Sequence, residues 1–116
     1  EARRSEDGNT LITRFIAGAG SETGLAFYDP AEKKIRWVTV SSGGTVFRST
    51  YTPVGDNWRQ DSDVTLPDGT KGKIRCDLVY TNGGKNLTIH INGKLGDEVI
   101  KDQKDIWRRV RSPQPK

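Results

Sequence analysis

The side chains with the most obvious chemistry are one cysteine, Cys76, and one histidine, His90, with Asp77 next to the cysteine. A thiol beside an imidazole is a nucleophile with its base, and an imidazole beside a carboxylate is a base with its orienting group. Either pairing requires the side chains to touch across the two apolar runs that carry them, 71–80 and 86–92. The chemistry therefore depends on how these runs pair.

A glycine-containing turn joins the two runs into an antiparallel hairpin. With a turn at Gly83-Gly84, the predicted pairs are Tyr80 with Leu87, Leu78 with Ile89, and Cys76 with Ile91. A turn at Asn82-Gly83 moves the pairs by two positions but keeps the same faces. Cys76 then lies on the apolar face, while His90 and Asp77 lie on the opposite face, so no Cys–His pair forms. We interpret Cys76 as an inert apolar residue and Asp77–His90 as an ordinary cross-strand pair, and we predict no catalytic residue and no enzymatic activity.

Cofactor sites have no support in the sequence. One histidine and no dense carboxylate cluster predict no metal site. No phosphate-binding loop of the Gly-x-x-x-x-Gly-Lys type occurs, and Gly18-Ala19-Gly20 is not followed by a helical pattern. The single cysteine excludes an internal disulfide. We expect no cofactor.

The arginine and aromatic residues of the runs 34–41 and 45–52 are more informative. With a two-residue turn between the runs, Trp37 shares a face with Arg48, which predicts stacking of the guanidinium on the indole, and Tyr51 lies on the other face. Both faces then mix apolar and polar groups, as in a sheet that lines a cavity on one side. The candidate cavity residues are Phe15, Phe27, Trp37, Arg48, Tyr51 and Trp58. The alternative is that Trp37, Trp58 and Trp107 are core anchors.

Turn signals recur about every 8–12 residues, and the runs between them are short, β-branched and aromatic, which is typical of an all-β domain. The predicted strands cover 10–17, 24–28, 34–41, 45–52, 57–65, 71–80, 86–92 and 105–111. Short connections between consecutive strands predict an antiparallel up-and-down meander, which curls into a barrel or an open half-barrel. Residues 94–104 hold either a short strand or one helical turn.

One domain is expected, at 9–111, with an N-terminal flank at 1–8 and a C-terminal tail at 112–116 that contains two prolines. No apolar run approaches the ~18–20 residues of a membrane span, so no membrane insertion is expected. Without an initiator Met or a signal-peptide pattern, we expect a processed or trimmed chain.

The net charge of +4 arises from one end of the chain. Residues 1–100 are balanced, and the excess lies in 101–116, where six basic residues outnumber two acidic ones. Arg109 and Arg111 share one strand face, and Arg108 points to the other, so no continuous basic stripe forms. We interpret this end as solubilising or protecting a sheet edge, and nucleic acid is a less favoured partner.

Several turns and aromatic residues recur along the predicted strands: Phe27-Tyr28-Asp29-Pro30, Trp37, a Gly-Gly turn, Pro67-Asp68-Gly69 and a closing Ile106-Trp107. This layout resembles small bacterial proteins of the lipocalin-like, or calycin, barrel class. The resemblance covers residues 9–111 and implies a meander barrel whose interior holds a small apolar or amphipathic ligand. The family's initial Gly-x-Trp strand is absent. Either the first strands are missing, or the sheet is open and its edge is covered by a tail or a second copy.

These observations favour a non-enzymatic binding module for a small apolar or amphipathic ligand. The alternative is a structural or interaction domain without a cavity, which forms a homodimer through an open sheet edge. Binding of nucleic acid is less favoured, and an enzyme is the least favoured reading.

Overall fold

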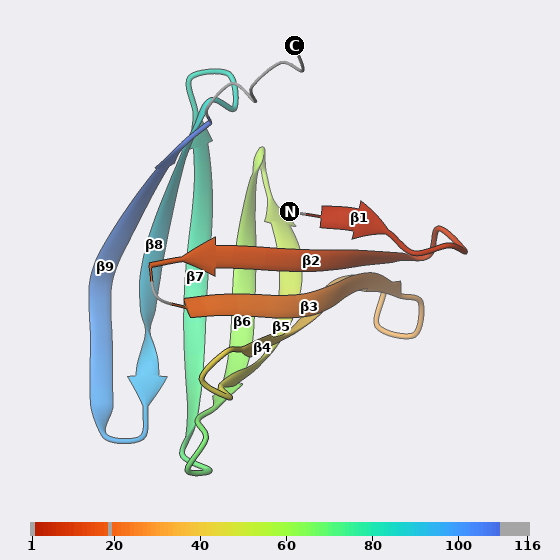
Figure 1. The fold of residues 1–116 in the computed structure, drawn as a ribbon. Coiled ribbons are helices and arrows are strands. Elements are labelled where there is room, and N and C mark those ends of the chain that lie inside the picture. The colour runs from red at the N-terminus through yellow and green to blue at the C-terminus, as the bar shows by residue number, and fades with distance from the viewer. Residues whose placement is uncertain (1, 19, 110–116) are drawn as a thin grey trace.

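The computed structural model describes residues 2–18 and 20–109 and contains one antiparallel sheet whose spatial order follows the chain (Figure 1). Its strands are β1 (Ala2–Arg4), β2 (Thr10–Ala17), β3 (Gly20–Asp29), β4 (Lys34–Ser41), β5 (Val46–Val54), β6 (Asn57–Thr65), β7 (Lys71–Thr81), β8 (Asn86–Leu95) and β9 (Glu98–Arg108). The predicted all-β antiparallel meander is confirmed. Strands β2, β4 and β6 have the predicted bounds, because turn residues flank β-rich runs there.

The segment 94–104 contains the end of β8, a turn at Gly96 and the first part of β9. Of the two predicted alternatives for this segment, strand structure is present and a helical turn is not, but the new strand is the eleven-residue β9 rather than a short one. The predicted N-terminal flank 1–8 contains the short strand β1, which pairs with β2. The end of the predicted strand 105–111 and the tail 112–116 extend beyond the described residues, which stop at Arg109.

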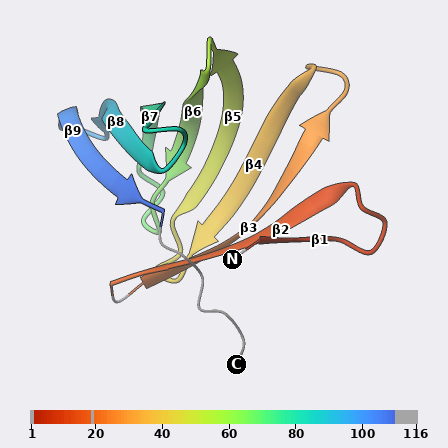
Figure 2. The same cartoon turned by 90° about the horizontal axis from the view of Figure 1, so that it is seen from above.

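The sheet is strongly curved but not closed (Figure 2), so of the two predicted alternatives, a barrel and an open half-barrel, the closed barrel is wrong. Within the described chain, β1 pairs only with β2 and β9 only with β8. Strands β2 and β3 cross the direction of β7–β9 steeply, which prevents a backbone ladder between the two ends (Figure 1). Side chains meet instead: the rings of Phe15 on β2 and Trp107 on β9 lie 5.2 Å apart.

Three glycines on the concave face allow adjacent strands to approach closely. A Cβ atom at Gly93 would overlap the Lys73 carbonyl oxygen and lie 2.8 Å from the Ile74 Cα. Gly72 faces Leu95 with similar overlap, and Gly24 faces Thr39. Glycine at these positions accommodates a tight bend of the sheet.

The face pattern predicted for β4 and β5 is wrong. The turn contains three residues, Ser42-Gly43-Gly44, rather than two, and the amide of Ser41 donates to the Thr45 carbonyl at 2.9 Å. The odd turn length reverses the relation between the faces. Trp37 therefore pairs with Ser49. Arg48 pairs with Val38 on the convex face, so the predicted Trp37–Arg48 stack does not form.

The concave face has a small buried centre. Val64, at 2% exposure, is the one buried hydrophobic side chain among the described residues. Beside it the hydroxyls of Ser49 and Ser62 lie 2.7 Å apart, and the Gln60 amide donates to Ser49 Oγ at 3.1 Å. Within the described residues no second layer covers this face (Figure 2).

We predict that Gly93→Ala lowers the free energy of unfolding by about 1–3 kcal/mol, because its methyl group must displace backbone atoms of β7. The control is Gly43→Ala, whose methyl group would meet its nearest atom at 3.9 Å. Urea denaturation followed by circular dichroism measures both. Equal stability of the two variants would contradict the close approach of β7 and β8.

Candidate functional site

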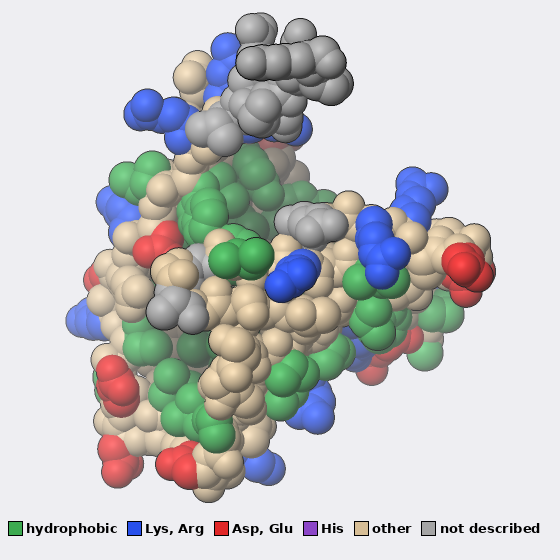
Figure 3. Space-filling view, in the orientation of Figure 1, with side chains coloured by type: hydrophobic (Ala, Val, Ile, Leu, Met, Phe, Trp, Pro, Cys, Tyr) green, Lys and Arg blue, Asp and Glu red, His purple; other side chains and the backbone are tan. Residues whose placement is uncertain are grey.

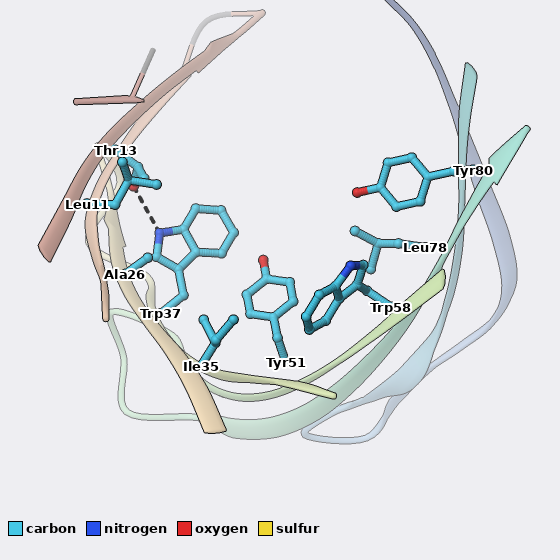
Figure 4. A pocket seen from close by; sticks show the side chains of 9 residues that line it. All are labelled: Leu11, Thr13, Ala26, Ile35, Trp37, Tyr51, Trp58, Leu78 and Tyr80. Atoms are coloured by element: carbon cyan, nitrogen blue, oxygen red, sulfur yellow. Dashed lines mark hydrogen bonds between the residues drawn. The ribbon is translucent and has the colours of Figure 1, made fainter. Parts of the chain in front are cut away.

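The concave face contains a hollow of about 350 Å³, open on one side (Figure 4). Its lining is mainly apolar and comes from six strands. The lining residues are Leu11, Thr13, Ala26, Ile35, Trp37, Tyr51, Trp58, Leu78 and Tyr80. A hollow of this size and character suits a small organic molecule.

The curvature brings four aromatic rings from β4, β5, β6 and β7 to this hollow (Figure 4). Trp37 is held in place because its indole N–H donates to Thr13 Oγ1 at 2.9 Å. Its ring centre lies 6.0 Å from that of Tyr51, with 35° between the planes. Trp58 and Tyr80 stand on the other side of Tyr51. Since the Trp37 side chain is anchored, this side of the hollow is formed before a ligand enters.

Three polar atoms in the lining have no hydrogen-bond partner among the described residues: the hydroxyls of Tyr51 and Tyr80 and the indole N–H of Trp58. The two hydroxyls point into the open space (Figure 4). Burial raises the pKa of Tyr51, and Cys76, Tyr80 and Glu22 add to this effect. The Tyr51 phenol therefore stays protonated at neutral pH and can donate a hydrogen bond.

The structure brings together three of the six predicted cavity residues: Trp37, Tyr51 and Trp58. Phe15 is on the concave face, but it contacts Trp107 away from this hollow. The other two predicted residues, Phe27 and Arg48, lie on the convex face, as shown by pairing of Phe27 with Arg36 and of Arg48 with Val38.

Leu78 and Tyr80 also line the hollow, although the sequence predicts only that they share one apolar face of a hairpin. The predicted pairs of that hairpin, Tyr80 with Leu87 and Leu78 with Ile89, are confirmed. The missing information was the pairing of Trp58 with Leu78, which makes that apolar face continuous with Trp58.

Cys76 and His90 lie on opposite faces, as predicted. Cys76 is half-buried on the concave face opposite Ile91. Burial raises the pKa of its thiol to about 11, and Asp77, Asp105 and Asp61 add to the effect. His90 pairs with Asp77 on the convex face, where Arg59 Nε donates to the Asp77 carboxylate at 2.9 Å. These two side chains therefore cannot form a nucleophile–base pair in this fold.

The convex face of β6 and β7 carries cross-strand ion pairs. Arg75 contacts Asp61 at 2.8 Å and Arg59 contacts Asp77 at 2.9 Å, while Lys73 and Asp63 are 3.6 Å apart. The Lys73 and Arg75 pairs are exposed and the Arg59 pair is half-exposed, so each contributes little to stability. They identify the convex face as the solvent-facing side of this part of the sheet.

In the described part of the chain, no helix is long and apolar enough to cross a membrane. Among the same residues, no three or more His, Cys, Asp or Glu side chains gather in a way that could hold a metal ion. No protein-family model matches the chain, and no curated protein matches it.

We predict that Cys76 reacts slowly with 5,5′-dithiobis(2-nitrobenzoate) at pH 7.5, because its raised thiol pKa leaves little thiolate. The rate should increase as the pH rises toward about 11. The urea-unfolded chain is the control and should react faster at the same pH. A native rate equal to the unfolded rate would contradict a buried thiol.

Proposed function

We propose that this protein binds a small apolar or amphipathic ligand in the hollow of its concave face. The observation that carries the proposal is the group of four aromatic side chains, Trp37, Tyr51, Trp58 and Tyr80, around about 350 Å³ of open space. Apolar surface left facing water is unfavourable by about 25 cal/mol per Å², and a ligand that covers it recovers this free energy.

The unpartnered polar atoms support an amphipathic ligand. Two phenol hydroxyls and one indole N–H can donate to an oxygen or nitrogen acceptor on a bound molecule. Each such bond contributes about 0.5–1.5 kcal/mol net, which is enough to orient a ligand held mainly by apolar contacts. The Trp37–Thr13 hydrogen bond keeps one side of the hollow preorganised and lowers the entropy lost on binding.

The resemblance of the strand layout to the lipocalin-like class supports the same proposal, since a carrier of this class holds its ligand inside a curved meander sheet. The hollow is open on one side, which gives a ligand direct access to it (Figure 4). The proposed role is non-enzymatic binding, as a carrier or sensor.

We predict saturable one-to-one binding of the fluorescent probe N-phenyl-1-naphthylamine, with a blue shift of its emission. Trp58→Leu should weaken binding by about tenfold, because it removes the ring that forms one wall of the hollow. Tyr51→Phe should weaken it about threefold, because the N–H of the probe then loses the Tyr51 hydroxyl oxygen as an acceptor.

The matched control is Tyr28→Phe, because Tyr28 is also on the concave side but is 59% exposed and lies outside the lining. Its affinity for the probe should equal that of the wild-type protein. Unsaturable binding, or equal loss in all three variants, would contradict a defined site. Circular dichroism verifies that each variant is folded.

Self-association through the outer edge of β9 is a second candidate function. The observation that favours it is the exposure of Val99 and Ile106, at 66% and 74%, on a strand whose outer side is unpaired within the described residues. A β-bulge in β9 disfavours pairing of this edge with a second copy, because it interrupts the regular strand between Ile100 and Gln103. At the bulge the Asp102 amide donates to Asn92 Oδ1.

This candidate predicts a dimer at micromolar concentration in sedimentation velocity, and Ile106→Lys should return the protein to a monomer because it places a charge in the interface. A wild-type monomer across that range would contradict edge pairing. Of the basic residues Arg108, Arg109 and Arg111 near the end of the chain, Arg111 lies outside the described residues.

A further inference from the structure

We propose that the preferred ligand of the hollow is an organic cation, such as a quaternary ammonium compound with an aryl or alkyl group. The inference rests on the proposed function and assigns the charge of the ligand. It is carried by the aromatic rings of the lining and by the segregation of charged side chains between the two faces of the sheet.

The lining provides the groups that bind organic cations. Of the nine aromatic side chains, three each of Trp, Tyr and Phe, all except Phe27 lie on the concave face according to the strand register. Two Trp and two Tyr rings border the hollow itself. The negative face of such rings attracts a cation within about 6 Å, Trp most strongly, and several rings together form an aromatic cage for a quaternary ammonium group.

Basic side chains avoid the concave face. In β2–β9 of the described chain, every Lys and Arg outside the β9 bulge lies on the convex face. Lys101 is in that bulge, and Arg4, on the short edge strand β1, faces the concave side opposite Leu11 but is exposed and outside the lining. The hollow is thus free of positive side chains although the chain has a net charge of +4. Figure 3 shows Lys and Arg mainly around the periphery of the molecule in that view.

Acidic side chains do occur on the concave face. Glu22 pairs with Phe15 and Ser41, Asp105 pairs with Ile89, and Glu98 is farther along β9. The Glu22 carboxylate has no hydrogen bond or ion pair to any described residue, and partial burial raises its pKa. Glu22 borders a neighbouring hollow of the concave face with Phe15 and Ser41, and its charge contributes to raising the pKa of Tyr51. A half-buried carboxylate without a counter-charge favours a cation nearby and disfavours an anion.

Two isosteric probes test the sign of the charge. In 4-hydroxy-N,N,N-trimethylanilinium a positive nitrogen occupies the place of the quaternary carbon of 4-tert-butylphenol, so their shapes match and their charges differ. Isothermal titration calorimetry on the whole chain should show the cation binding about tenfold more tightly. Trp58→Leu should reduce the affinity for the cation about tenfold.

Glu22→Gln should weaken binding of the cation about threefold and leave 4-tert-butylphenol unchanged. The matched control is Glu32→Gln, which makes the same change in net charge at an exposed position and should alter neither affinity. Equal affinities, or tighter binding of 4-tert-butylphenol, would overturn the inference and leave the proposed function in place. If neither compound nor N-phenyl-1-naphthylamine binds, both the inference and the proposed function fail.

Discussion

A single sheet that must form its own core is the constraint on which this structure depends. In the part of the chain that the structure describes, no second layer lies on the concave face, so apolar side chains are removed from water by bending the sheet around them. Gly24, Gly72 and Gly93 permit that bending, and the contact between Phe15 and Trp107 joins the two ends. Because this closure uses side chains and no backbone ladder, one side of the sheet stays open and the interior stays hollow.

The same constraint separates the chemistry of the two faces. The convex face meets water and carries the ion pairs of Arg59, Lys73 and Arg75. The concave face concentrates aromatic rings and leaves the Tyr51 and Tyr80 hydroxyls without partners among the described residues. The proposed ligand binding and the proposed preference for a cation both rest on this separation.

The sequence was sufficient where local signals decide the structure. The β7–β8 pairs followed from alternation about a glycine turn, and β6 followed from turn residues at both ends. The β4–β5 faces were wrong because Ser42-Gly43-Gly44 forms a three-residue turn, and one extra residue reverses the faces. The open sheet and the meeting of Trp58 with Leu78 depend on curvature, which no local pattern encodes. Half of the predicted cavity residues therefore lie elsewhere.

The most direct test of the account is the indole region of a ¹H–¹⁵N correlation spectrum during titration with N-phenyl-1-naphthylamine. The chain has three tryptophans, and they occupy distinct environments. The Trp58 indole resonance should move most, because its N–H has no described partner in the hollow, and that of Trp107 should move least. A saturable shift of Trp107 with Trp58 unchanged would contradict ligand binding in the hollow that Trp58 lines.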